Sequence, residues 1–541
     1  MNLPFQKQIF YHILFLEKFA RLIDLTYFCP AFDHKGYILE ISFCRIVVEK
    51  YNKMKMKINP NKESRRSFIK KAAIFSAAVP TILTSVKGRT KAAPVKFAPA
   101  NERVNLAVCG IGNRGSEVIS AFARTGLCNF VAFADVDMGG ENTVETLERY
   151  PNVRRFQDFR EMFDKMGNEI DAVAAIVPDH AHYPISITAM QLGKHIFTEK
   201  PLGRTFRENE LLIQAAKKYP KVVTQMCNQG HSGPNFFQFK AWTEAGIIKD
   251  VTAISAHMNN WRRWHDFDPT IKSMPPGEPI PSTLDWYNWV MAANYHPYNK
   301  HAYVHGQWRC WYDYGMGALG DWGAHIIDTA HRFLNLGLPY EVTPLKIDRH
   351  NPFFYPMAST LLFRFARRGD MPPCDITWYD GVDNLPPIPP GYGVVGLDPN
   401  IPPPSAGTLG EARLNPGKII YSNTLTFKGG SHASTLSIIP DEKAREMESR
   451  LPVVPRYQSD LPENVHHFEN FLKACKGEEQ AQSPFEISAP LSQVFSLGVI
   501  AQRLNEKIEF NASRNEITNN RMANDLLSPP PRKGWEQYYR I

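Results

Sequence analysis

The 541-residue chain has the composition of a folded globular protein, with 43% hydrophobic and 21% charged residues, and is long enough for two sizeable domains. Its formal net charge of +8 is unevenly distributed. Residues 1–92 hold 17 Lys and Arg against 6 Asp and Glu, whereas residues 93–541 hold 45 against 48. The basic excess therefore belongs to the N-terminal segment, and the charge gives no support to nucleic-acid binding by the rest of the chain.

An export signal lies well inside the N-terminal segment. Ser64–Lys70 (SRRSFIK) has the adjacent arginines of a twin-arginine signal, and a mildly apolar stretch follows it. An amphipathic helix with a chance arginine pair is the alternative. We expect residues 54–93 to form a signal peptide that sends the folded protein to the periplasm. No cysteine follows the apolar stretch and no later run of about 18 apolar residues appears, so we expect no stable membrane anchor.

The first 53 residues have no clean period and no domain-like pattern. Twin-arginine signals normally start near the N-terminus, and Met54 and Met56 stand at a suitable distance before Ser64. We therefore expect translation to begin at one of these methionines, which makes residues 1–53 a prefix that is absent from the product. A membrane-contacting prefix is the weaker alternative.

A βαβ unit with a dinucleotide-binding pattern begins at Val104. An apolar strand leads into Gly110-x-Gly112-x-x-Gly115, and a helical pattern follows. Glycines at these positions permit a tight turn and the close approach of a pyrophosphate to the helix N-terminus. The second strand, FVAFADVD, places Asp135 twenty residues after Gly115, where an acid accepts hydrogen bonds from the ribose hydroxyls.

Asp135 favours NAD, because a carboxylate would repel the 2′-phosphate of NADP, although Arg114 leaves NADP possible. A third strand, DAVAAIVP, ends at Pro178, and we expect Asp179 and His182 in the loop that follows; His182 is either a ligand contact or a capping or core histidine. A helix then leads to a fourth strand, KHIFTEKP. The expected cofactor-binding residues are Gly110, Gly112, Asn113, Arg114, Gly115, Asp135, Pro178, His182, Glu199, Lys200 and Asn228.

Two further motifs carry a resemblance to a known family. EKPLG at Glu199–Gly203 ends the fourth strand, and YGMGALGDWGAHIIDTAHRFL spans Tyr314–Leu334. With the glycine loop, they make residues 104–338 resemble the Gfo/Idh/MocA oxidoreductases. The resemblance implies an α/β chain with a Rossmann domain at 94–225 and an α+β substrate domain with a large open, mostly antiparallel sheet at 226–541. We also expect a homo-oligomer, either a dimer or a tetramer.

The same motifs supply catalytic candidates. Asp321 and His325 are four residues apart and share one face of a helix. His325, with a pKa near the ordinary histidine value, can remove the hydroxyl proton of an alcohol while Asp321 either orients it or holds the substrate. Lys200 can polarise the alcohol oxygen. The alternatives are a surface lysine and a helix N-cap with a core histidine; the family resemblance favours the catalytic roles.

Aromatic and charged residues suit a carbohydrate substrate, because aromatic faces pack on sugar rings and charged donors bind hydroxyls. A buried aromatic core explains most of them equally well. The substrate-binding candidates are His231, Trp261, Arg262, Trp311 and Tyr312. The cysteines have no metal-type spacing, so we expect them to be reduced and mostly buried, and we expect no metal site.

The second half contains strand-like runs at ASTLLFRFA, CDITWYDG and IIYSNTLTFKG and helical patterns at VHHFENFLKAC and PLSQVFSLGVIAQRLN. Residues 384–417 are rich in Pro and Gly and are expected to form a lid or an oligomer contact.

Together these features predict an oxidoreductase that moves a hydride between a secondary alcohol of a sugar or glycoside and a tightly held nicotinamide cofactor. No free NAD pool exists outside the cytoplasm, so the hydride should be returned within the reaction. One alternative is an NAD-dependent glycosidase of the same family that works by oxidation and elimination; the lysine of the EKP motif favours the plain oxidoreductase. A non-catalytic sugar-binding protein is the other alternative.

Overall fold

The computed structural model describes residues 102–258, 270–304, 306–381, 384–393 and 414–541. The expected prefix and signal peptide lie outside the described residues, as do Trp261, Arg262 and most of the Pro/Gly-rich loop.

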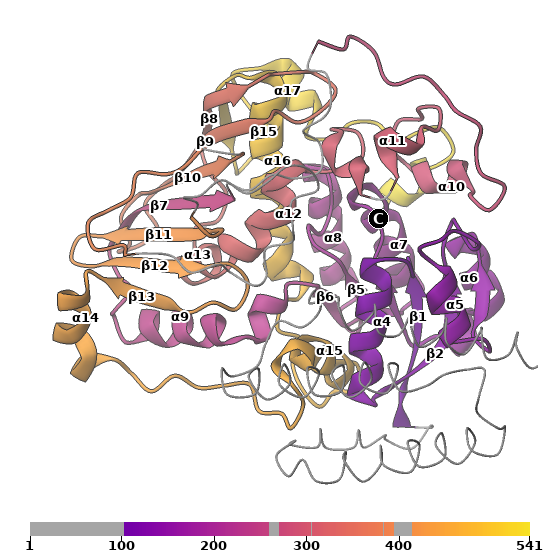
Figure 1. Ribbon diagram of the computed structural model, residues 1–541, viewed down its shortest axis with the longest axis horizontal. Helices are drawn as coiled ribbons and strands as arrows, with labels where there is room; N and C mark the ends of the chain where they lie inside the picture. The colour runs from indigo at the N-terminus through magenta and orange to yellow at the C-terminus, as the bar shows by residue number, and fades with distance from the viewer. Residues whose placement is uncertain (1–101, 259–269, 305, 382–383, 394–413) are drawn as a thin grey trace, which may run out of the picture. The chain divides into compact units, whose positions relative to one another are not determined.

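The first sheet is entirely parallel and forms a Rossmann domain (Figure 1). Its strand order, β3-β2-β1-β4-β5-β6, is that of the dinucleotide-binding fold. The strands are β1 (Val104–Cys109), β2 (Cys128–Ala134), β3 (Arg154–Phe156), β4 (Ala172–Ala175), β5 (His195–Thr198) and β6 (Thr224–Met226). Most residues of β1, β4 and β5 are buried, as expected for parallel strands covered on both faces.

Helices follow the parallel strands in the usual alternation. They are α4 (Arg114–Thr125), α5 (Val144–Arg149), α6 (Phe159–Met166), α7 (Asp179–Gln191) and α8 (Phe206–Lys218). Helix α8 starts with a capping box, in which the Thr205 hydroxyl accepts from the Glu208 N–H and the Glu208 carboxylate accepts from the Thr205 N–H. The carboxyl ends of β1, β4 and β5 therefore meet the start of α4, α7 and the α8 loop at one edge of the sheet.

The second sheet has nine strands in the order β13-β12-β11-β7-β10-β9-β8-β14-β15. Only the β7–β10 pair is parallel, so the sheet is mixed and mostly antiparallel, as the family resemblance implies. The strands are β7 (Val251–Met258), β8 (Glu341–Asp348), β9 (Ala358–Phe365), β10 (Cys374–Asp380), β11 (Gly417–Ser422), β12 (Thr426–Gly430), β13 (Leu436–Ile439), β14 (Ile508–Asn511) and β15 (Glu516–Ile517).

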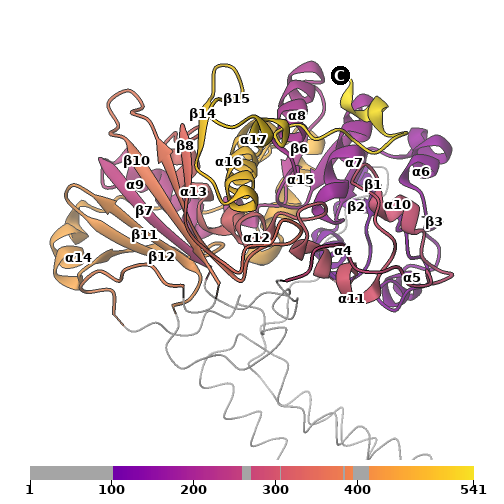
Figure 2. The same cartoon turned by 90° about the horizontal axis from the view of Figure 1, so that it is seen from above.

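The helices of this half are shorter and less regularly placed. They are α9 (Pro234–Glu244), α10 (Trp286–Val290), α11 (Lys300–Tyr303), α12 (Gly317–Ile326), α13 (Asp328–Phe333), α14 (Asp441–Met447), α15 (His466–Cys475), α16 (Phe485–Leu504) and α17 (Arg521–Asp525). Figure 2 shows α16 and α12 between the nine-stranded sheet and the Rossmann helices. Helix α16 packs on α8 and β6 of the Rossmann domain and on β8 and β9 of the large sheet, so it joins the two halves.

Element boundaries depart from the sequence predictions in two places. The run IIYSNTLTFKG is a hairpin of β11 and β12, because the chain turns at Asn423 and Thr424 instead of continuing as one strand. Helix α7 begins at Asp179, directly after Pro178, and therefore includes His182. The six cysteines of the described residues are free, five of them buried, as expected. No helix in the described part of the chain is long and apolar enough to cross a membrane.

Candidate active site

The glycine loop between β1 and α4 has the conformation that its sequence requires. Gly110 has a φ of 83°, and a Cβ there would lie 2.1 Å from the carbonyl oxygen of Ile176. A Cβ at Gly115 would lie 2.1 Å from the carbonyl oxygen of Gly110. Both glycines are therefore fixed by close backbone packing, which leaves the N-terminus of α4 open to a phosphate.

Asp135 follows β2 at the same edge of the sheet and holds the glycine loop. Its carboxylate accepts hydrogen bonds from the N–H groups of Ile111 (2.9 Å) and Asp137 (3.0 Å). Burial raises the pKa of Asp135, and these backbone N–H groups oppose that rise. The predicted ribose acceptor thus also organises the loop.

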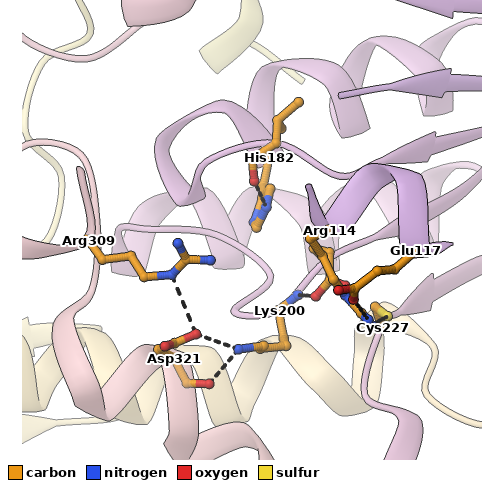
Figure 3. A network of polar contacts seen from close by, with 9 residues as sticks. Arg114, Glu117, His182, Lys200, Cys227, Arg309 and Asp321 are labelled. Carbon is orange, nitrogen blue, oxygen red and sulfur yellow. Dashed lines mark hydrogen bonds and ion pairs between the residues drawn. The ribbon is translucent and has the colours of Figure 1, made fainter. Parts of the chain in front are cut away.

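Glu199 and Arg114 tie the EKP segment to the start of α4. The Arg114 Nε lies 2.8 Å from the Glu199 carboxylate, which is nearly buried, and its other nitrogens contact Glu117 and Cys227 (Figure 3). Burial alone would raise the pKa of Glu199, but Arg114 and Lys200 hold it below its usual value. The two residues therefore have a structural partner in each other, and their predicted cofactor contacts remain predictions.

Lys200 reaches across to the second half of the chain. Its Nζ donates to the Asp321 carboxylate (2.6 Å) and to the Asp321 carbonyl oxygen (2.5 Å). Arg309, from the 3-10 helix η4 (Gln307–Cys310), places its Nε 3.5 Å from the same carboxylate. Figure 3 shows Lys200 and Arg309 approaching Asp321 from different sides. The side chains of Lys200 and Arg309 are 14% and 22% exposed, so both cations can still meet a ligand.

Asp179, the first residue of α7, belongs to the same group of charges. It is 5% exposed, and its carboxylate accepts a hydrogen bond from the Met316 N–H (3.0 Å). Burial raises its pKa to about 7; Arg309 and Lys200 oppose the rise, whereas Asp321 adds to it. Two carboxyl groups and two cations therefore share one site.

His325 lies one turn after Asp321 on α12 and is 8% exposed. Its ring stacks on His432 at a centroid distance of 3.9 Å and an interplanar angle of 16°. Burial, His432 and Lys200 hold the pKa of His325 well below the usual histidine value, whereas Asp321 raises it. The pKa of His325 therefore lies below the ordinary value expected from the sequence, because the ring is buried and close to His432 and Lys200. The imidazole is neutral at pH 7, and its Nδ1 has no hydrogen-bond partner.

Asn228 follows β6 and is 0% exposed, yet neither atom of its side-chain amide has a partner. Buried amides are nearly always paired, so this amide lacks a partner that a bound molecule would have to supply. His231, three residues later, is placed differently. Its ring contacts the Asp328 carboxylate (2.7 Å) and the Gln482 carbonyl oxygen (2.8 Å) and is 1% exposed, so it is a structural residue and not a substrate contact.

Two other predicted site residues lie in the core. Trp311 is 0% exposed, donates its indole N–H to the Ala302 carbonyl oxygen and packs on Tyr303 and Phe354, which rules out a substrate contact. His182 is 1% exposed, and both ring nitrogens are engaged, by the carbonyl oxygens of Pro201 and Val177. His182 therefore packs against the EKP loop as a buried core histidine, which is one of the two alternatives that the sequence left open.

The arrangement fits a dinucleotide. The glycine loop supplies backbone N–H groups at a helix N-terminus, Asp135 supplies an acceptor beside it, and the unpaired Asn228 amide lies at the end of β6. These residues would hold the two nucleotide halves along the carboxyl edge of the sheet. Among the residues that the structure describes, no three His, Cys, Asp or Glu side chains gather as a metal site would need.

Three residues of the site escaped the sequence analysis: Asp179, Arg309 and His432. Asp179 directly follows Pro178, and Arg309 stands two residues before Trp311, but no spacing rule links either to Asp321. His432 lies in the turn after β12, more than one hundred residues after His325, with a φ of 53°. Only the folded chain brings these three together.

Comparisons with known proteins agree with the fold. Residues 104–226 match the Gfo/Idh/MocA model described as an oxidoreductase family with an NAD-binding Rossmann fold. Residues 246–356 match the model for the C-terminal alpha/beta domain of the same family. The WlbA dehydrogenase of Chromobacterium violaceum, solved with NADH and UDP-GlcNAcA, superposes with a TM-score of 0.50 at 12% identity, over 77% of this chain and 99% of that one. Residues 104–226 and 246–356 are thus similar to the two domains of the Gfo/Idh/MocA oxidoreductases, the first of them an NAD-binding Rossmann fold, and the WlbA structure agrees with this fold.

Two curated relatives differ in their reactions. The α-N-acetylgalactosaminidase of Shewanella oneidensis is 28% identical over 181 residues, which is 30% of this chain and 39% of the relative. The levoglucosan dehydrogenase of Pseudarthrobacter phenanthrenivorans is 26% identical over 191 residues, which is 35% of this chain and 39% of the relative. The match thus spans about two-fifths of the length of each of these relatives.

Proposed function

We propose that the protein is an NAD-dependent oxidoreductase that acts on a secondary alcohol of a sugar or glycoside. The observation that carries the proposal is the contact of Lys200 with Asp321 beside the neutral His325, at the edge of the sheet where the glycine loop opens. When bound there, NAD takes up or returns a hydride.

The chain's own residues supply the rest of the chemistry. His325 is neutral and has a free ring nitrogen, so it can accept the hydroxyl proton as the carbon is oxidised. Asp321 stabilises the imidazolium that forms, because its charge favours protonation of His325. Lys200 and Arg309 place positive charge where the substrate oxygen becomes negative, and the low exposure of the site strengthens that interaction.

A direct experiment tests this assignment. Denaturing the purified protein should release a dinucleotide that mass spectrometry identifies as NAD. Rapid mixing of the intact protein with a panel of sugars and glycosides should then change the nicotinamide absorbance for at least one of them, before the hydride is returned. Release of no dinucleotide, or no absorbance change with any sugar for a protein that contains NAD, would contradict the proposal.

An NAD-dependent glycosidase is the second candidate, and the similarity to an α-N-acetylgalactosaminidase favours keeping it. In that reaction, oxidation of one ring carbon acidifies the neighbouring C–H bond. His325 or a second base removes that proton, the glycosidic bond breaks by elimination, and the same hydride is returned after water adds.

Deuterated water separates the two candidates. A glycosidase would release the aglycone from a nitrophenyl glycoside and leave deuterium on the carbon next to the oxidised one. A plain oxidoreductase would leave the glycosidic bond intact. A non-catalytic sugar-binding protein would do neither, and Lys200, Asp321 and His325 would then have no chemical task.

We also propose export to the periplasm by the twin-arginine route, on the basis of Ser64–Lys70. This route carries folded proteins, so cofactor can be loaded before export. Replacing Arg65 and Arg66 by lysine should leave the protein in the cytoplasm, whereas deletion of residues 1–53 should leave export unchanged. Continued export of the double lysine variant would refute the proposed route.

A further inference from the structure

A cavity of about 150 Å³ lies at the N-terminus of α8, and its wall contains two arginines. Arg204 precedes α8 and Arg503 is near the end of α16, so the two come from opposite sides of the contact between the Rossmann domain and α16. None of Lys200, Asp321 or His325 lines this cavity.

Among the described residues, neither guanidinium group forms an ion pair with a carboxylate. Arg204 donates from Nη1 to the Tyr312 carbonyl oxygen (3.0 Å), and its buried Nε has no partner. Arg503 lies over the ring of Tyr312 at 5.2 Å, and its guanidinium makes no hydrogen bond or ion pair within the described ranges. Guanidinium donors that are partly buried and unpaired are costly unless an anion meets them.

Tyr312 and Asp313 complete the polar wall. Tyr312 is 2% exposed and its hydroxyl has no hydrogen-bond partner. Asp313 receives a hydrogen bond from the ring of His296 (2.8 Å). Burial would raise the pKa of Asp313, but His296, Arg204 and Arg503 hold it below its usual value. With two arginines and one carboxylate, the wall keeps one net positive charge, which a single negative charge would neutralise.

The opposite wall is apolar. It contains Val499 and Ile500 of α16, and Leu526, Pro529 and Pro530 of the C-terminal segment. With an inorganic anion bound, these apolar residues would stay in contact with water, whereas a short carbon chain would cover them. The cavity volume of about 150 Å³ accommodates a short carbon chain.

We propose that this cavity binds a short-chain monocarboxylate, whose carboxylate meets Arg204 and Arg503 and whose carbon chain packs on the apolar wall. A hydroxyl on the chain would pair with the Tyr312 hydroxyl. The site is separate from the Lys200 site and does not depend on the oxidoreductase proposal.

Isothermal titration calorimetry of the purified full-chain protein tests the site with L-lactate and its uncharged analogue propane-1,2-diol. Lactate should bind and propane-1,2-diol should not. The Arg503→Gln variant should weaken lactate binding about tenfold or more, the loss expected for a hydrogen bond to a charged group. The Lys507→Gln variant removes an equal charge from an exposed position and should bind lactate as the wild type does.

A second variant guards against a folding defect. Tyr312→Phe removes only a hydroxyl that has no partner, so its melting temperature without ligand should match the wild type while its lactate affinity falls. Equal binding of the diol, binding of phosphate but not lactate, or no binding at all would overturn the proposal. Loss of lactate binding in Lys200→Met but not in Arg503→Gln would place the ligand in the active site and also overturn it.

Discussion

The cofactor side and the catalytic side of the candidate site are built in opposite ways. On the cofactor side, the Asp135 carboxylate is satisfied by backbone N–H groups of its own domain, and the glycines are fixed by close packing. On the catalytic side, Lys200 of one domain pairs with Asp321 of the other, while His325 keeps a buried ring nitrogen without a partner.

The hydrogen bonds of the cofactor side are therefore complete without a ligand, whereas those of the catalytic side are not. The glycine loop binds the same cofactor whatever the substrate, because backbone contacts set its shape. A site with unpaired buried atoms gains free energy when a ligand supplies the missing partners. Mutations on the catalytic side should therefore lower turnover, whereas mutations on the cofactor side should weaken NAD binding. Four experiments test this difference.

The largest effect is expected from His325→Ala on the catalytic side. Loss of the general base should lower kcat about 10²–10⁴-fold, while bound NAD is retained because the glycine loop is untouched. Steady-state turnover and the dinucleotide content of the purified variant measure the two effects. His301→Ala, at an exposed histidine of α11, should change neither. Near wild-type turnover of His325→Ala would remove histidine from the mechanism.

Lys200→Met should have the second-largest effect. Its kcat should fall about 10²–10³-fold, the cost of removing one group that stabilises a developing oxyanion. Lys200 stands at the boundary of the two sides, so this variant should also release part of the NAD. Turnover at saturating NAD separates the two contributions. If Lys200→Met retained full turnover, the contact with Asp321 would be structural and Arg309 would be the remaining cation.

The two sides also differ in how far the sequence could predict them. The glycine loop and Asp135 are local patterns, since each glycine is needed by the turn in which it stands, and the parallel sheet and Rossmann fold followed from the strands around them. The large antiparallel sheet came from family resemblance, because its strands pair across long separations. Trp311 could not be assigned, since an aromatic residue of the core and one of a sugar site look alike in sequence.

On the catalytic side, the sequence could predict only the residues that stand in a recognisable motif. Lys200, Asp321 and His325 stand in two motifs, and the structure brings them together. Arg309, Asp179 and His432 reach the site through tertiary packing, with no spacing rule to link them. The low pKa of His325 has the same origin, because burial and the stacked His432 depend on the folded chain.

Replacing Asp179 tests whether ionisation of this buried carboxyl group destabilises the folded protein. Its folded pKa of about 7 lies above the unfolded value of about 3.9, so the folded protein holds this proton more tightly. The stability from that proton is fully present below about pH 4 and is lost as the pH rises to about 7. Asp179→Asn does not titrate, and asparagine can still accept from the Met316 N–H. Its unfolding free energy relative to wild type should rise by roughly 2–4 kcal/mol across that range.

Urea unfolding of both proteins at several pH values measures this difference. Asp164→Asn, at an exposed position of α6, is the matched control and should show a constant offset from the wild type. A constant offset for Asp179→Asn as well would mean that the cations of the site hold Asp179 ionised, and that the catalytic side is as well satisfied as the cofactor side.

The smallest effect is expected on the cofactor side, from Asp135→Ala. This change removes the acceptor for the N–H groups of Ile111 and Asp137 as well as the predicted ribose contact. NAD affinity should fall by roughly 1–3 kcal/mol, the usual cost of leaving such groups unpaired, while kcat at saturating NAD stays near the wild-type value. Asp135→Asn keeps one acceptor oxygen and should lose less. Calorimetric titration of the cofactor-free variants with NAD gives the affinities. An Asp135→Ala protein that binds NAD normally but turns over slowly would reverse the two signatures, and with them the division of the site into a cofactor side and a catalytic side.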